Sequence, residues 1–347
     1  MHRSNLCQLC GCVRPITDEY ISKMEESMFK RLAMLVACGL LIGASALAQD
    51  LRFATIGTGH VTGVSYPAGG AIARVAARQA RALGLRVSVE ATAGGGYNLQ
   101  TLLDGEMDFA ITNEYLVGKA WSGTGPFASA GPANNLRFVM RLHEQVMFVV
   151  AHPNAGIATF DDLKGKKVAL GGEGSDAAAI TDAIFAAKGW TQTSISEQPG
   201  RIGNAVMDLC DRNIDAYIVV DGVINSGITE AATACDAVLV PVTGAAIDTM
   251  LAAEPGLRAA SIPNGAYRGM SGDVQTIGTS ALLVSSTNVD SRTVYDVTRL
   301  TLSDVNRFTI LHPSLKPLTA ERMSSGMPEG LFLHAGAESY FREAGLQ

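Results

Sequence analysis

Short apolar runs alternate along the chain with segments in which apolar residues recur at helical spacing. The short runs predict strands, and they lie at 51–56, 86–92, 108–112, 138–142, 146–151, 166–171, 215–220, 237–242 and 280–286. The helical spacing predicts helices at 67–83, 97–104, 176–188, 201–210 and 290–308. Strands that alternate with helices are typical of an α/β fold, with parallel-rich sheets and helices on both faces.

Two of the predicted strands run into glycine-rich loops that lead to helices. The first loop covers residues 57–66, and Pro67 is the predicted first residue of its helix, because proline is tolerated there. The second loop covers residues 171–175, and Ser175 or Asp176 is the predicted N-cap of the next helix. Helix N-termini attract carboxylates and phosphates, and ligands of open α/β sheets bind at the carboxyl ends of strands. Both loops therefore indicate an anion-binding site.

The first loop does not match the dinucleotide fingerprint. That fingerprint needs three glycines in the order G-x-G-x-x-G, and here Thr62 stands at the third position after Gly57 and Gly59. The sequence therefore disfavours a nicotinamide or flavin dinucleotide, and we expect no cofactor.

The N-terminal region has the pattern of an export signal. Basic residues at 30–31 precede an apolar stretch at 32–47, and Ala46-Leu47-Ala48 is a small-residue cleavage pattern. We expect residues 28–48 to be a signal peptide, residues 1–48 to be removed, and the mature protein to be periplasmic. The alternative is lipid attachment at Cys38, but the apolar run before it is short, which favours cleavage after Ala48.

Composition excludes some classes of function. The chain carries 27 Lys and Arg against 33 Asp and Glu, for a formal net charge of −6, so we expect no nucleic-acid partner. Neither a G-x-S-x-G elbow nor an H-E-x-x-H motif occurs, which disfavours an exported hydrolase and a metal site.

Two cysteines, Cys210 and Cys235, remain after the predicted leader is removed. In an oxidising compartment two such thiols tend to pair. A disulfide between them is one interpretation, and two separately buried thiols are the other.

Several stretches in order along the mature chain resemble one family of transport receptors. They include "IGTGHVTGVSYPAGGAIARVA", "VEATAGGGYNLQTLLDGEMDFAIT", "FDDLKGKKVALGGEGS", "LCDRNIDAYIVV" and "CDAVLVPVTGAAID". Together they are similar to the TAXI-type solute receptors of tripartite ATP-independent periplasmic (TRAP) transporters. The resemblance implies a type II-like, two-lobed periplasmic binding protein, hinged by crossover strands, that closes over a small carboxylate such as glutamate or 2-oxoglutarate. It also implies delivery of that solute to TRAP permease subunits in the membrane.

The resemblance also implies where the lobes divide. The first lobe is expected at 49–150 and 276–347, and the second at 151–275. The same fold could instead serve an ABC importer or a sensor kinase, and the sequence of the cleft does not separate these partners.

Eight residues at predicted strand ends or helix starts are candidate ligand contacts. Each has an ordinary structural alternative: a turn, a helix cap, a packing tyrosine or an exposed acid. Glu114 is the best indicator of the ligand, because an acid there would pair with an ammonium group and so favours a glutamate-like amino acid over a dicarboxylate. The candidates are Thr58, Gly59, Tyr66, Asn98, Asn113, Glu114, Ser175 and Asp221.

Overall fold

A computed structural model describes residues 51–198 and 202–346 of the chain. The predicted signal peptide, the segment before it and Cys38 lie outside the described residues. Residues 51–347 belong to one compact unit. Within the described residues, no helix is both long enough and apolar enough to cross a membrane.

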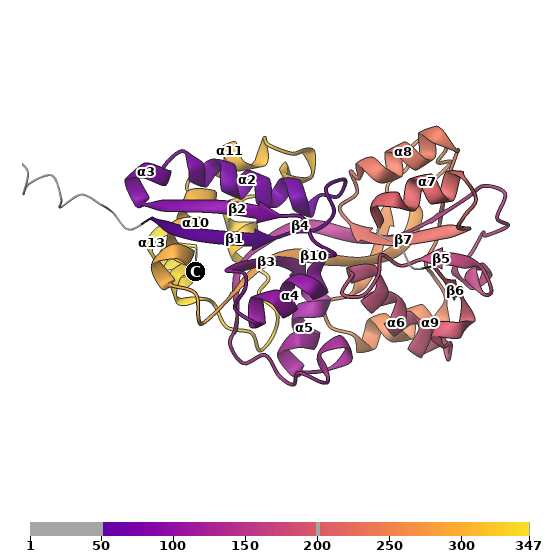
Figure 1. Ribbon diagram of the computed structural model, residues 1–347, viewed down its shortest axis with the longest axis horizontal. Coiled ribbons are helices and arrows are strands. Elements are labelled where there is room, and N and C mark those ends of the chain that lie inside the picture. The colour runs from indigo at the N-terminus through magenta and orange to yellow at the C-terminus, as the bar shows by residue number, and fades with distance from the viewer. Residues whose placement is uncertain (1–50, 199–201, 347) are drawn as a thin grey trace, which may run out of the picture. The chain divides into compact units, whose positions relative to one another are not determined.

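A mixed ten-stranded sheet runs through this unit (Figure 1). Its main path has the order β2-β1-β3-β10-β4-β7-β5-β6, while β8 pairs with β4 and β9 pairs with β10. The outer strands on each side are parallel to one another, and the central β4 and β10 are antiparallel to their neighbours. The strands are β1 (Arg52–Gly57), β2 (Leu85–Glu90), β3 (Phe109–Asn113), β4 (Leu136–Ala151), β5 (Lys167–Ala169), β6 (Ser196–Glu197), β7 (Ala216–Asp221), β8 (Val238–Val240), β9 (Arg258–Ile262) and β10 (Val274–Ser286).

The helices connect successive strands, as the predicted α/β fold requires, and this fold class is confirmed. The α-helices are α2 (Ser65–Ala77), α3 (Ala80–Leu83), α4 (Gly95–Leu103), α5 (Glu114–Ser122), α6 (Asp176–Lys188), α7 (Ala205–Cys210), α8 (Ser226–Ala234), α9 (Ala245–Ala253), α10 (Ser291–Leu302), α11 (Val305–Thr309), α12 (Ala320–Ser324) and α13 (Ala335–Ala344). Among the described residues, five short 3-10 helices lie in the connections between these elements, at 125–127, 160–163, 192–194, 202–204 and 313–315.

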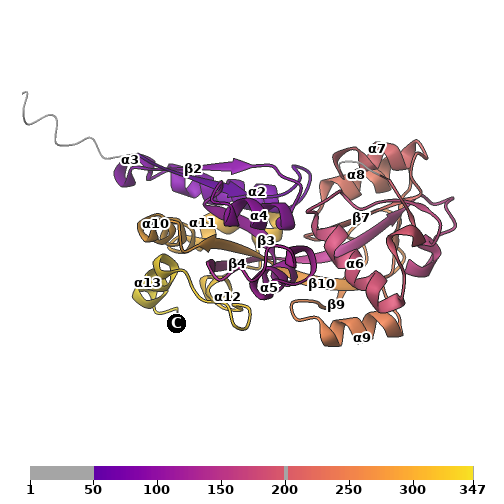
Figure 2. The same cartoon turned by 60° about the horizontal axis from the view of Figure 1, so that its bottom comes forward.

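The two long strands β4 and β10 join two halves of the sheet (Figure 2). We call β1, β2 and β3 with α2–α5 and α10–α13 the first half, and β5–β8 with α6–α9 the second half. The chain passes from the first half to the second along β4 and returns along β10. The predicted lobe boundaries near residues 150 and 276 fall at the end of β4 and the start of β10, and the division into two lobes remains a prediction.

The core packs on both faces of the sheet. One apolar cluster runs along a single face through both halves and includes Leu116, Phe138 and Ile180. The opposite face carries separate clusters, one beneath α2 and α10 and one beneath α7 and α8. The continuous cluster therefore packs residues of both halves into one core.

The sequence prediction was wrong at β4 and at two helix boundaries. The expected strands at 138–142 and 146–151 are one strand, because β10 pairs with β4 on both sides of the polar stretch between them. Helix α2 begins at Ser65, so Pro67 is its third residue, and the expected helix at 290–308 is divided where Asp304 caps α11. By contrast, the predicted helix at 176–188 coincides with α6.

Candidate functional site

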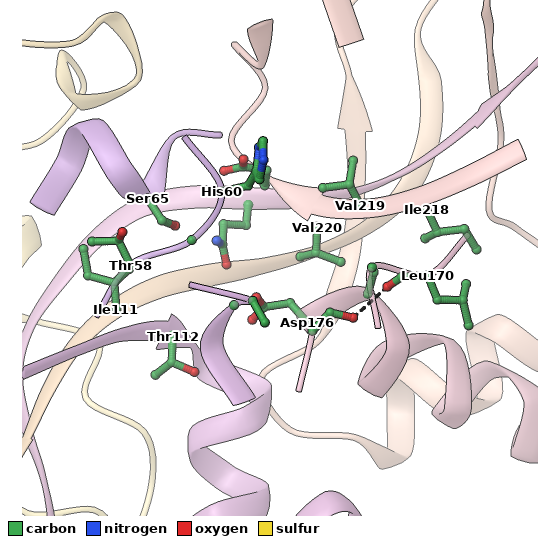
Figure 3. A pocket seen from close by; sticks show the side chains of 18 residues that line it. Thr58, His60, Ser65, Ile111, Thr112, Leu170, Asp176, Ile218, Val219 and Val220 are labelled. Atoms are coloured by element: carbon green, nitrogen blue, oxygen red, sulfur yellow. Dashed lines mark hydrogen bonds between the residues drawn. The ribbon is translucent and has the colours of Figure 1, made fainter. Parts of the chain in front are cut away.

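A small cavity lies where the two halves of the sheet meet, at the carboxyl ends of their strands (Figure 3). Its volume is about 60 Å³, which is room for about four water molecules or a comparably small solute. In Figure 3, Thr58, Ser65 and Ile111 lie on one side and Leu170, Ile218 and Val219 on the other. The cavity therefore has walls from both halves of the sheet, in the place where open α/β sheets bind ligands.

Asp221, the last residue of β7, connects the second half to the first. Both carboxylate oxygens lie 3.0 Å from the backbone nitrogen of Val64, the N-cap residue of α2. The carboxylate also accepts from Gly222 N–H at 2.7 Å and from the Asn225 side-chain amide at 3.0 Å. A buried carboxylate from the second half thus occupies the N-terminus of a helix in the first half, as the helix dipole favours.

Asp176, the first residue of α6, makes an equivalent connection. Its Oδ2 accepts from the backbone N–H of Gly95, which begins α4, at 2.9 Å. Its Oδ1 accepts from the Asn113 side-chain amide at 2.5 Å. Ser175, not Asp176, is the N-cap of α6, because its hydroxyl accepts from Ala178 N–H at 3.1 Å. The Asp176 carboxylate is therefore free to reach across the cavity.

Backbone contacts also cross between the halves. Tyr97 N–H donates to the carbonyl of Gly174 at 3.1 Å, and Ser226 N–H donates to the carbonyl of Thr62 at 3.2 Å. The glycines at these crossings have no room for a side chain: a Cβ on Gly96 would lie 2.8 Å from the Gly174 carbonyl oxygen. The halves are closed on each other in this structure.

Two buried polar side chains in the cavity wall have an atom without a partner in the described structure. Gln145, from the middle of β4, is 4% exposed, and its Oε1 makes no hydrogen bond. Thr112, from β3, is 2% exposed, and its hydroxyl makes none either. Because a buried polar atom without a partner is costly, both atoms indicate a place where a bound molecule supplies the missing hydrogen bond.

Four of the eight residues predicted as ligand contacts line the cavity: Thr58, Gly59, Ser175 and Asp221. The Thr58 hydroxyl donates to the carbonyl of Glu90 at 2.6 Å, and the Ser175 hydroxyl donates to the carbonyl of Leu170 at 2.6 Å. Because each hydroxyl already donates its one hydrogen, it can only accept a hydrogen bond from a solute. Asp221 makes the contacts between halves described above.

The other four predicted contacts lie outside the cavity wall. Asn98 is buried behind it, where its amide donates to the carbonyls of Thr58 and Ile111 and so fixes the β1–α2 loop. Asn113 caps α5 and donates to Asp176. Tyr66 is 36% exposed on α2. Glu114 lines a different cavity, beside Lys119 and Glu254, so the position that suggested an ammonium partner is not where the cavity's acids lie.

Of the two acids in the wall, sequence reasoning selected Asp221 but preferred a helix cap for Asp176 over a ligand contact. It singled out neither Gln145 nor Thr112, which carry the unpaired atoms. The signal that could have identified Gln145 was the polar triplet His143-Glu144-Gln145 between two strongly apolar runs. The pattern instead suggested that this triplet separates two strands.

Burial raises the pKa of both cavity aspartates to about 6. For Asp176, hydrogen bonds from Gly95 N–H and Asn113 act against this rise, and for Asp221 those from Val64, Gly222 and Asn225 do so. The charge of Asp176 further raises the pKa of Asp221. The described wall holds neither Lys nor Arg, and burial lowers the pKa of His60, the one imidazole that lines it, so at neutral pH the two carboxyl groups have no strong cation beside them.

Behind Asp221, the imidazole of His143 is buried in β4 without hydrogen-bond partners. Its Nε2 lies 3.9 Å from Asp221 Oδ1, and neither ring nitrogen makes a hydrogen bond among the described residues. Burial, reinforced by the charge of His312, lowers the pKa of His143 to about 3. His143 is therefore neutral in the folded protein at neutral pH.

His143 is expected to make the fold sensitive to acid. Because its pKa falls from about 6.5 in the unfolded chain to about 3 in the folded protein, its contribution to stability is complete above about pH 6.5 and is lost as the pH falls towards 3. The raised pKa values of Asp176 and Asp221 change stability with pH in the opposite direction. The effect of His143 is therefore measured as the difference between the wild type and a variant that lacks this histidine.

The comparison is between the wild type and His143→Leu, each unfolded by urea at pH 6.5 and at pH 4.5. We expect the wild type to lose about 2 kcal/mol more of its free energy of unfolding than the variant over this interval. Equal losses in the two proteins would show that His143 does not titrate as the burial of its ring requires.

Among the described residues, no group of three or more His, Cys, Asp and Glu side chains is arranged to hold a metal ion. Cys210 and Cys235 form a disulfide with their Cα atoms 5.4 Å apart. The bond joins the last residue of α7 to the residue that follows α8. Neither cysteine lines the cavity.

A family model described as the NMT1-like family matches residues 56–345, which is most of the chain. The chain belongs to this family. The match spans both halves of the sheet and every segment that lines the cavity.

Several solved structures are similar to this chain, and two of the three given below are described as solute-binding proteins. A protein of Bordetella bronchiseptica RB50 has 18% identity and a TM-score of 0.50, over 85% of this chain and 82% of its own. The substrate-binding protein of an amino acid ABC transporter has 14% identity and a TM-score of 0.45, over 77% and 100%. The alkanesulfonate-binding protein of Xanthomonas axonopodis pv. citri, bound to MOPS, has 16% identity and a TM-score of 0.45, over 85% of each chain. At these identities the likeness concerns the fold alone.

Proposed function

We propose that this chain is a periplasmic solute receptor, which captures a small solute between the two halves of the sheet and delivers it to a membrane permease. The observation that carries the proposal is the cavity itself, which has walls from both halves and two buried side chains with unpaired polar atoms. Membership of the NMT1-like family supports a binding role over catalysis.

The proposed motion is a hinge opening of two lobes about β4 and β10. In the proposed division, lobe 1 comprises 49–150 and 276–347, and lobe 2 comprises 151–275. The contacts of Asp176 and Asp221 with the other half would break in the open form. A solute that touches both walls favours closure through those contacts alone.

We propose that the solute is a glutamate-like amino acid rather than 2-oxoglutarate or another dicarboxylate. The cavity wall contains two aspartates and neither Lys nor Arg, so a second carboxylate on the solute would meet like charge. The cavity volume of about 60 Å³ favours solutes smaller than glutamate unless the halves separate slightly.

For the partner, we propose a TRAP permease, on the strength of the motifs that resemble TAXI-type receptors. An ABC importer is the second candidate, and a sensor kinase the third. The predicted signal peptide at 28–48 supports a periplasmic location for any of the three. A pull-down of the exported protein with membrane proteins of its own cell would separate them by the partner recovered.

Solute binding is tested by a thermal-shift screen of amino acids, small amines and dicarboxylates on the mature chain. A solute at 100 times its dissociation constant should add about 2.7 kcal/mol to the free energy of unfolding, which raises the melting temperature. Gln145→Met should reduce the shift, because it removes the unpaired acceptor, whereas the matched change Gln100→Met on the exposed face of α4 should not. If no small solute raises the melting temperature, the receptor function is wrong.

A further inference from the structure

The cavity between the two halves presents negative charge and hydrogen-bond acceptors. Asp176 and Asp221 line it, and none of its lining residues in the described chain is Lys or Arg. The N-termini of α2 and α4, which would attract an anionic solute, are already occupied by these carboxylates through Val64 N–H and Gly95 N–H. An anionic solute would have to displace one of the protein's own acids.

The two aspartates differ in their remaining capacity to accept hydrogen bonds. A carboxylate has about four lone-pair sites. Asp221 already accepts from Val64, Gly222 and Asn225, with both oxygens facing Val64 N–H. Asp176 accepts from the Asn113 amide on one oxygen and from Gly95 N–H on the other, and its own backbone N–H is a third donor, against four hydrogen bonds at Asp221. Asp176 is therefore the acid that retains room for a donor from a solute, while Asp221 contributes charge.

The unpaired atoms in the wall provide a second, independent indication. Gln145 Oε1 is an acceptor without a donor, and the Thr112 hydroxyl is buried without a partner. Both residues line the same cavity as Asp176. A solute that satisfies them brings at least one N–H or O–H donor into a space where the buried Asp221 and the partly buried Asp176 have neither Lys nor Arg beside them, and burial lowers the pKa of the neighbouring His60. Buried charges in proteins are normally paired.

We propose that the group this cavity recognises is an ammonium, and that it binds small primary amines whether or not they carry a carboxylate. This inference rests on the proposed function as a solute receptor and adds the chemical class of the solute. The ammonium donates to Asp176 and to Gln145 Oε1, which uses two of its three N–H donors. The volume of about 60 Å³ limits the rest of the molecule to a few heavy atoms.

The test is calorimetry on the mature chain at pH 8, where carboxyls with a pKa of about 6 are ionised. The probes are ethanolamine, which carries an ammonium, acetamide, which is neutral, and propionate, which is an anion of similar size. We expect ethanolamine to bind at least ten-fold more tightly than acetamide and propionate not to bind. Binding of propionate without ethanolamine would overturn the ammonium proposal and leave the receptor function standing.

The role of charge is separated from that of closure by Asp176→Asn. This change also disturbs the contact with Gly95 or Asn113, so affinity alone does not decide the matter, and the ratio of ethanolamine to acetamide affinity is the readout. We expect the ratio to fall about ten-fold in Asp176→Asn and to stay unchanged in Asp182→Asn, a matched change on the exposed side of α6. If Asp176→Asn weakens both probes equally, Asp176 is only a closure contact and the proposal fails.

Discussion

Gly63→Ala is expected to weaken solute binding roughly 10- to 100-fold while leaving the protein folded. A Cβ built on Gly63 overlaps the carboxylate of Asp221, and that carboxylate is held in place by Gly222 and Asn225. The alanine would therefore separate Val64 N–H from Asp221, a buried charged hydrogen bond worth about 1.5–3 kcal/mol, which corresponds to roughly a 10- to 100-fold change in affinity. Isothermal calorimetry with a solute identified by the screen measures the change.

Gly70→Ala is the matched control for this variant. It makes the same change within α2, the helix that Gly63 precedes, but a Cβ on Gly70 meets no atom within 4 Å, so solute affinity should be unchanged. Gly96→Ala provides a second obstruction to closure, because its Cβ would lie 2.8 Å from the Gly174 carbonyl oxygen. Wild-type affinity in both Gly63→Ala and Gly96→Ala would show that binding does not require the closed arrangement.

Removal of the disulfide is expected to destabilise the protein without affecting the cavity. The bond joins residues 25 apart in the sequence, and the loss of loop entropy in the unfolded chain then corresponds to about 3 kcal/mol. The double variant Cys210→Ala/Cys235→Ala should lose about that much free energy of unfolding in a urea titration.

Solute affinity serves as the internal control for the disulfide variant. Cys210 and Cys235 lie at the ends of α7 and α8, outside the cavity wall, so affinity in the folded variant should match the wild type. An unchanged urea midpoint would contradict the stabilising role of the bond.

The sequence pattern predicted the fold class because most of the strands and helices bury a local apolar face. It predicted α6 to the residue, since Ser175 provides a cap and Gly189 ends the helix in a left-handed conformation. It failed at β4, because His143 and Gln145 are polar positions that only the pairing with β10 keeps in the strand. No local pattern contains that pairing.

The sequence pointed to the strand ends that line this candidate cavity, but it did not predict the acidic character of the cavity. The glycine-rich loops and strand ends located the cavity, since Thr58, Gly59, Ser175 and Asp221 line it. The sequence treated the helix N-termini as open to an anionic ligand, whereas Asp176 and Asp221 occupy them from the opposite half. Contacts between residues 81 and 157 positions apart leave no mark on local composition, so the acidic character of the cavity emerged only in the structure.

The most direct test of the central claim, that the solute is held between the two halves, is amide hydrogen exchange on the mature chain with and without a solute found by the screen. We predict slower exchange in two segments that are distant in sequence, residues 58–65 of the β1–α2 loop and residues 170–177 of the β5–α6 loop, because both line the cavity. A larger cavity beside His143, of about 830 Å³ and lined also by Pro263 and Pro317, provides the contrasting location. Protection confined to that region, or to one of the two loops alone, would contradict the account.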